Sequence, residues 1–168
     1  MYPDGPHNAE GLAIHPNGDI YIFTKEENTD STDAFPAKLF RIKKDKWEDA
    51  GDGEIMLDYQ GELNIPKLAN SDSALGGVIT SFDIAPDGKR FLILTYDNAY
   101  EFDMDLSKTA LKPASDLKEG KDYSVIKLTL LPQQESIACL GVGKRFIYDT
   151  EYHFYEVPIL KLECLDGN

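Results

Sequence analysis

A turn flanked by two short apolar strands occurs three times in this chain, and this repeat constrains the fold more than any other feature. The central copy, residues 78–102, is the clearest, because its turn at residues 86–88 reads Pro-Asp-Gly. Proline presets φ there, aspartate favours the turn and glycine supplies a positive φ. The turn glycines of the three copies are Gly18, Gly88 and Gly143, and Gly-Val-Gly replaces Pro-Asp-Gly in the third. Such a repeat indicates an all-β fold built from similar antiparallel units.

The strand pattern predicts a partial β-propeller of three four-stranded antiparallel blades, the last of which lacks its outer strand. The blades cover about residues 8–60, 76–131 and 133–165 of a single domain, residues 1–168. The expected strands begin near residue 10 and then cover residues 19–24, 38–43, 54–59, 78–85, 90–96, 99–105, 123–131, 135–140, 144–150 and 159–164.

Burial is predicted from the pattern of apolar residues within these strands. Residues 91–94 are apolar on both faces, which is typical of a strand that is covered on both sides. Residues 99–105 alternate between apolar and acidic side chains, which predicts a half-exposed strand.

Three kinds of connection are expected between the strands. Residues 45–53 form an acidic turn, and residues 115–121 could form a short helical turn. Residues 26–35 and 60–77 carry almost no strand pattern and are interpreted as long insertions at blade corners. Such loops either contact a ligand or are insertions that the fold tolerates.

The composition limits the classes of function. The chain has 168 residues, of which 42% are hydrophobic, and no apolar run is long enough to cross a bilayer. A net charge of −13, from 30 acidic and 17 basic residues, opposes binding to nucleic acid. The first residues show no signal peptide, but the compartment stays open because a longer precursor could be exported. We therefore expect a soluble, acidic protein with no nucleic acid partner and no membrane insertion.

Two residue types carry open alternatives. Cys139 and Cys164 lie on different predicted strands and are expected in the core, with a disulfide between them as the alternative. Trp47, the only tryptophan, either packs against the outer edge of its blade or serves as an exposed recognition residue.

Nearly the whole chain resembles the C-terminal half of a bacterial six-bladed β-propeller protein, of an NHL- or WD-repeat-like family that is mostly uncharacterised. The resemblance is carried by NAEGLAI at residues 8–14, PNG at 16–18, YIFTK at 21–25, SFDIAPDG at 81–88, TY at 95–96, AYE at 99–101 and LPQQESIA at 131–138. Related propellers include calcium-dependent lactonases, phytase-like enzymes and interaction scaffolds. The resemblance implies a fold more specifically than an activity.

One set of residues stands at the same offset from each turn glycine. Glu10, Thr80 and Glu135 open the three inner strands, so in a propeller they ring one mouth of the central channel. Two carboxylates and a hydroxyl could bind Ca²⁺, which takes six to eight oxygen ligands. Alternatively they are solvated polar groups of the channel mouth, or they accept N–H groups between blades. Two close carboxylates need a cation, a proton or an inserted Lys or Arg as compensation.

The histidines give weak signals for catalysis. No phosphate-binding loop, zinc pattern or nucleophile elbow is present, and the three histidines are scattered. His7 and Asn8 lie at the entry to the first inner strand and are possible channel-mouth residues, and His7 is a candidate ligand or acid–base group. His15 precedes a proline and is interpreted as a turn residue.

Two functions remain open from the sequence. The first is a non-enzymatic binding or scaffold segment, and the second is part of a calcium-assisted hydrolase with a site on the channel axis. A sector of three blades leaves apolar faces and strand edges uncovered. The expected partner is therefore either the missing half of the propeller or a second copy of this chain.

Overall fold

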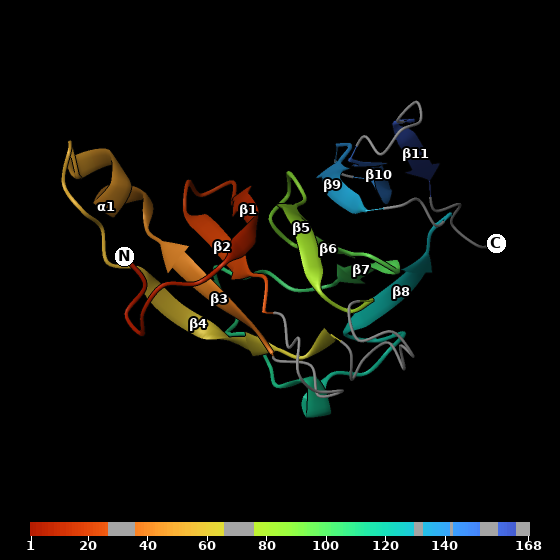
Figure 1. The fold of residues 1–168 in the computed structure, drawn as a ribbon, viewed down its shortest axis with the longest axis horizontal. Helices are drawn as coiled ribbons and strands as arrows, with labels where there is room; N and C mark the ends of the chain where they lie inside the picture. Colours follow the sequence, from red (N-terminus) through yellow and green to blue (C-terminus); the bar gives the residue numbers. More distant parts are fainter. Residues whose placement is uncertain (27–35, 66–75, 130–132, 142, 152–157, 164–168) are drawn as a thin grey trace.

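The fold consists of three antiparallel β-sheets of four, four and three strands, none of them closed into a barrel (Figure 1). This computed structural model describes residues 1–26, 36–65, 76–129, 133–141, 143–151 and 158–163. The sheet orders are β1-β2-β3-β4, β5-β6-β7-β8 and β11-β10-β9. The all-β class and the division into sheets of four, four and three strands are confirmed.

Each sheet is one continuous stretch of chain, because each strand pairs with the strand that precedes it. Sheet 1 contains β1 (Ala9–Ile14), β2 (Ile20–Thr24), β3 (Ala37–Ile42) and β4 (Asp58–Leu63). Sheet 2 contains β5 (Ile79–Ile84), β6 (Phe91–Thr95), β7 (Asn98–Phe102) and β8 (Tyr123–Lys127). Sheet 3 contains β9 (Gln134–Cys139), β10 (Arg145–Thr150) and β11 (Leu160–Glu163).

The sheets lie side by side through their first strands. β5 lies between β1 and β9, and the remaining strands of each sheet follow outward (Figure 1). Sheet 2 is therefore covered on both faces, whereas sheets 1 and 3 each have one neighbour among the described residues. The prediction for residues 91–94 is confirmed, since every residue of β6 is buried.

Two apolar cores fill the spaces between the sheets. The core between sheets 1 and 2 is rich in aromatic rings, and Phe91 stacks on Phe102 with 4.7 Å between ring centroids. Its buried members include Tyr21, Phe23, Leu39, Phe82, Phe91, Ile93, Tyr100 and Phe102. The core between sheets 2 and 3 contains Leu92, Leu94, Ala99, Leu128, Ile137, Phe146 and Tyr148.

The two junctions between sheets are built differently. At the first, β1 approaches β5 at Gly11, where an added Cβ would lie 2.8 Å from the Cβ of Phe82. At the second, side chains of β5 accept backbone N–H groups of β9. Ser81 Oγ accepts from Ile137 N at 3.2 Å, and Asp83 Oδ2 accepts from Cys139 N at 2.7 Å.

The turns follow the repeat in two copies out of three. Gly18 and Gly88 have φ values of 93° and 69°, as the turn pattern predicts. In the third turn the positive φ belongs to Gly141, at 68°, so the expectation for Gly143 is wrong. Without a proline to preset φ, the turn forms earlier in the Gly-Val-Gly sequence than the alignment of glycines suggests.

Helix α1 (Lys44–Asp49) occupies part of the stretch predicted as an acidic turn. Its start is stabilised from a distant turn, because Asp19 Oδ1 accepts the Lys44 N–H at 3.0 Å. The Trp47 indole N–H donates to the Gly18 carbonyl at 2.9 Å, so this side chain braces the first turn although it is 38% exposed. The expected helical turn near residue 115 is the 3-10 helix Ala114–Asp116. Within the described residues, every helix is too short to span a bilayer.

Two strand predictions need correction. β4 begins at Asp58 and extends to Leu63, later than the predicted residues 54–59, because Ile55 and Leu57 bond to Met1 and not to β3. β7 is buried rather than half exposed, since sheet 3 covers its second face. Glu101 is only 7% exposed there and pairs with Arg90. Most of the two long predicted loops, residues 27–35 and 66–75, lies outside the described residues.

Of the two cysteines that were expected in the core, the structure describes Cys139. Cys139 packs against the core between sheets 2 and 3, as predicted. Burial and the neighbouring Asp83 carboxylate raise the pKa of its thiol to about 12, which keeps the thiol protonated and unreactive at neutral pH. Cys164 lies outside the described residues, and so does the alternative disulfide.

Candidate functional site

Glu10, Thr80 and Glu135 occupy three equivalent β-bulges. In sheet 1, Ala9 pairs with Thr24 and Gly11 with Phe23, so Glu10 is the extra residue of β1. The same shift leaves Thr80 unpaired in β5 and Glu135 unpaired in β9. A bulge changes the direction of a side chain, and bulges are frequent next to functional sites. The sequence offset therefore identified structurally equivalent positions.

A chain of hydrogen bonds connects the two glutamates across all three sheets. Lys25 Nζ donates to Glu10 Oε1 at 2.9 Å and to the Tyr96 hydroxyl at 3.0 Å. The Tyr96 hydroxyl donates to Glu135 Oε1 at 3.2 Å. The Lys25 ammonium also lies 5.2 Å from the centroid of the Tyr96 ring, a cation–π distance. We call Glu10, Lys25, Tyr96 and Glu135 the axial network.

Lys25 and Tyr96 stand at equivalent positions of sheets 1 and 2. Each follows the threonine that ends the second strand, Thr24 or Thr95, and Glu151 follows Thr150 in the same way in sheet 3. Sequence reasoning foresaw that an inserted Lys or Arg could compensate the glutamates but did not identify Lys25. The sequence signal that could have identified Lys25 was its place directly after the threonine that ends the second strand of each repeat.

Burial and charge perturb the ionisation of the axial network. Burial alone would lower the pKa of Lys25, but hydrogen bonds to Tyr96 and Glu10 raise it above its ordinary value. Burial and the Glu10 carboxylate raise the pKa of Glu135, and Lys25 partly offsets them. Lys25 thus acts as the built-in cation between two carboxylates.

Thr80 does not join the axial network. Its side chain is 2% exposed, and its hydroxyl lies 3.5 Å from the Leu94 carbonyl, to which it donates. Across the described residues, no three His, Cys, Asp or Glu side chains lie close enough together to hold a metal ion. The structure therefore brings together two of the three predicted oxygen ligands and places a lysine beside one of them.

His7 lies among carboxylates and rings near the start of β1. Its Nε2 is 2.9 Å from Asp4 Oδ1, and its Nδ1 is 3.0 Å from Glu26 Oε1. Its ring lies 5.7 Å from that of Phe40, centroid to centroid. Asp4 also accepts from Lys38 Nζ at 2.6 Å, and hydrogen bonds from Lys38 and His7 lower its pKa to about 2. Both ring nitrogens of His7 thus face carboxylates.

Asn8, the other predicted channel-mouth residue, contributes through its backbone. Its carbonyl accepts the Lys25 N–H at 2.8 Å, and its side chain is exposed. Asn8 therefore helps to fix the backbone of the lysine that compensates Glu10.

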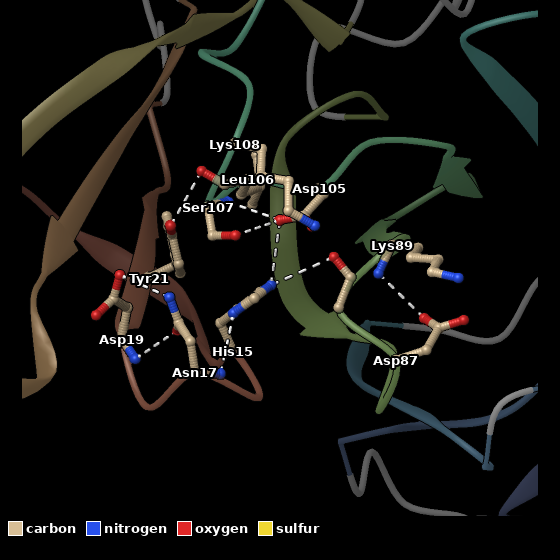
Figure 2. Close-up of polar contacts among 11 residues, drawn as sticks. His15, Asn17, Asp19, Tyr21, Asp87, Lys89, Asp105, Leu106, Ser107 and Lys108 are labelled. Carbon is tan, nitrogen blue, oxygen red and sulfur yellow. Dashed lines mark hydrogen bonds and ion pairs between the residues drawn. The ribbon is translucent and has the colours of Figure 1, made fainter.

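His15 joins two turns and the segment that follows β7 (Figure 2). It opens the first turn, as predicted, because its carbonyl accepts the Gly18 N–H at 2.8 Å, and it is only 6% exposed. Its Nδ1 accepts the Asn17 N–H at 3.2 Å, which leaves the proton on Nε2. That nitrogen lies 3.3 Å from both the Gly88 carbonyl and Asp105 Oδ1. His15 thus ties the first turn to the second.

The groups around Asp105 resemble a catalytic triad in composition but not in connectivity. Ser107 Oγ donates to Asp105 Oδ1 at 2.5 Å, and the serine is not bonded to the histidine (Figure 2). Burial works against the Asp105 carboxylate, but hydrogen bonds from Lys108 and Ser107 outweigh it and lower its pKa to about 2. A nucleophile needs a base that can take its proton, and both nitrogens of His15 are engaged elsewhere. The cluster is a structural clamp.

A cleft of about 650 Å³ lies between β4 and residues 111–115. Tyr59 and Glu62 are the ionisable groups among its described lining residues. The Ser115 hydroxyl, also in the lining, donates to Asp116 Oδ1 at 3.0 Å, and burial and the Glu62 carboxylate raise the pKa of Tyr59.

Two large apolar side chains of β1 are exposed on the face of sheet 1 that points away from sheet 2. Leu12 and Ile14 are each 60% exposed. They pair across β2 with Ile22 and Ile20, so the apolar side chains form one continuous patch. We call these four residues the free face of sheet 1. Sequence reasoning foresaw an uncovered blade face but did not name its residues.

The chain was compared with known protein families and proteins. No protein-family model matches it, and no match was found among curated proteins. The repeated sheets, the axial network and the free face of sheet 1 are therefore the basis for proposing a function.

Proposed function

We propose that this chain is a sector of a β-propeller that acts as a non-enzymatic binding or scaffold module, and that it binds a protein through the free face of sheet 1. One comparison within the molecule carries this proposal. Leu12 and Ile14 are 60% exposed, whereas Phe82 and Ile84, at the same positions of sheet 2, are 2% and 6% exposed. Sheet 1 covers the latter pair, so an equivalent surface should cover the former.

The energetic reason is the cost of leaving large apolar side chains in water. Full burial of a leucine or isoleucine side chain is worth about 1.5–3 kcal/mol. Scattered exposed apolar residues are ordinary, but a continuous patch in a strand register marks an interaction surface. The four residues of the free face form such a patch across β1 and β2.

Part of this side of sheet 1 is already covered by the chain itself. Phe40, which follows Ile22 in the register, is fully buried, and the ring of Tyr2 lies 4.8 Å from its ring, centroid to centroid. The N-terminal residues thus protect the outer strands and leave the inner two open. The partner's contact is expected over β1 and β2.

A calcium-assisted hydrolase is the alternative. In its favour, Glu10 and Glu135 occupy equivalent bulges and interact electrostatically. Lys25 supports the scaffold instead, because an ammonium bound to Glu10 fills the role that a divalent cation would have. Thr80 is also turned into the protein interior.

Photo-crosslinking tests the scaffold proposal. Benzoylphenylalanine placed at position 12 should form a protein adduct on irradiation. Ile14→Glu in the same chain should abolish the adduct, because it puts a charge into the contact. Thr109→Glu, at an exposed turn residue, adds the same charge elsewhere and should leave the adduct intact. Absence of an adduct, or an adduct insensitive to Ile14→Glu, would reject the proposal.

Calcium titration tests the alternative. A cation that binds only the folded chain at a hundred times its dissociation constant would stabilise it by about 2.7 kcal/mol. We expect no change in the thermal unfolding of the wild type. A stabilisation that disappears in the double variant Glu10→Gln with Glu135→Gln would favour the hydrolase.

A further inference from the structure

We infer that the partner of the free face of sheet 1 is a second copy of this chain, which presents the free face of sheet 3 in a head-to-tail arrangement. This inference rests on the function proposed above and names the partner. Two copies joined at both pairs of free faces would make a closed ring of six sheets.

The first argument is that the chain contains both halves of a repeated contact. Each junction brings one face of a sheet against the opposite face of the next sheet. Among the described residues, sheet 1 lacks a neighbouring sheet on the face that carries Leu12, and sheet 3 lacks one on the face that carries Ser136 and Ala138. The two free faces are therefore the two sides of one more junction of the same kind.

The second argument is the position of Ser136. In β9 it corresponds to Ser81 of β5, since each directly follows the bulge residue, Glu135 or Thr80. Ser81 Oγ accepts the N–H of Ile137 from the next first strand. Ser136 is exposed, and the residue equivalent to Ile137 at the next junction is Leu12 of a second copy. Ser136 is thus placed to accept the Leu12 N–H.

The third argument is that the uncovered areas of the two free faces are similar in extent. Tyr2 and His7 already cover the outer part of the side of sheet 1 that would meet the partner, at Phe40. The open part lies over β1 and β2, and sheet 3 has three strands where the other sheets have four. The face of sheet 3 is also hollowed, with a cavity of about 90 Å³ beside Ala138, Ile147 and the exposed Ile159. Apolar side chains from sheet 1 can enter such a hollow.

Sedimentation of the full chain tests this inference. At protein concentrations of about 1–50 µM we expect a two-copy species. Ile14→Arg and Ser136→Glu change one free face each, and each alone should weaken self-association at least about tenfold. Thr109→Glu is the control and should not change it. Circular dichroism and thermal unfolding check that each variant is folded.

Mixing distinguishes the head-to-tail arrangement from others. An equimolar mixture of Ile14→Arg and Ser136→Glu should recover the two-copy species, because one junction is then wild type and the other pairs arginine with glutamate. If Ser136→Glu alone still dimerises while Ile14→Arg does not, the contact is face to face through sheet 1 and the inference is wrong. Long open assemblies would equally overturn the closed pair.

A wild-type chain that stays monomeric throughout this range would also overturn the inference. The proposed function would still stand if position 12 gave an adduct with a different protein that Ile14→Glu abolishes. Failure of both experiments would reject the inference and the proposed function together.

Discussion

Lys25 lies beside Glu10, one of the two glutamates that the sequence repeat indicated as candidate calcium ligands. Its ammonium contacts Glu10 directly and reaches Glu135 through the Tyr96 hydroxyl. Its side chain is only 9% exposed, so its ammonium group is held inside the protein and not in the solvent. The stability of the junctions between the three sheets should therefore depend on this one cation.

Replacement of Lys25 by methionine tests that dependence. Lys25→Met keeps the length of the side chain but leaves Glu10 without its ion pair and Glu135 without the cation that offsets its raised pKa. We expect a loss of about 1–3 kcal/mol in the free energy of unfolding at pH 7, measured by chemical denaturation.

The loss should depend on pH in a defined direction. A raised folded-state pKa means that ionisation of Glu135 costs stability, so the penalty is full above the raised pKa, shrinks as pH falls through it towards the ordinary value of 4.5, and is absent well below 4.5. Adding Glu10→Gln and Glu135→Gln to Lys25→Met should recover part of the lost stability at pH 7. If the penalty is the same at pH 7 and at acid pH, Lys25 acts through packing and not through charge.

At the scale of the element, the turn between β5 and β6 depends on its contact with His15. Gly88 has a φ of 69°, and a Cβ added there would lie 2.5 Å from His15 Nε2. Gly120 has a similar φ of 76° but nothing within 4 Å of its added Cβ. Both positions carry the backbone strain of alanine at positive φ, and only Gly88 adds the collision.

Alanine at the two glycines separates strain from contact. Gly120→Ala should cost about 1–2 kcal/mol, the penalty of the left-handed conformation. Gly88→Ala should cost about 1–3 kcal/mol more, because His15 must move and release the Gly88 carbonyl and Asp105. Urea denaturation of both variants gives the comparison. Equal losses of stability in the two variants would show that His15 moves aside without a cost in free energy.

Helices and strands could be predicted from the sequence where the residues that define them are close neighbours in the chain. β6 follows from a continuous apolar run after a Pro-Asp-Gly turn, and both signals lie within a few residues of the strand. Helix α1 was missed because its stabilising groups, Asp19 and the Gly18 carbonyl, belong to a turn far upstream. The burial of Glu101 was missed for the same kind of reason, because Arg90, the residue before β6, pairs with it.

The candidate site shows the same division. The offset from the turn glycines placed Glu10, Thr80 and Glu135 on equivalent bulges, because a repeat preserves register. It could not tell that Thr80 bonds to a backbone carbonyl, since the side-chain direction at a bulge depends on the neighbouring strands. Lys25 and Tyr96 meet only when two sheets pack together, which no single repeat encodes.

At the scale of the whole molecule, the three sheets differ in how completely they are covered. Both faces of sheet 2 pack against a neighbour, whereas the described parts of sheets 1 and 3 have one neighbour each. Every sheet is also a continuous segment of chain. Sheet 1 or sheet 3 can therefore separate from sheet 2 without any strand of another sheet leaving its own sheet.

This arrangement should divide the chain into units that open separately. In native-state hydrogen exchange, the amides of β6 and β7 should be the slowest to exchange and should report global unfolding. Those of β10 and β11 should exchange earlier as one group, because their sheet has the fewest strands and a single covered face. Equal protection of all three sheets would indicate one all-or-none unit. If the order holds, the central sheet is the scaffold on which the two outer sheets fold, and newly made chain can form each sheet as soon as its last strand is complete.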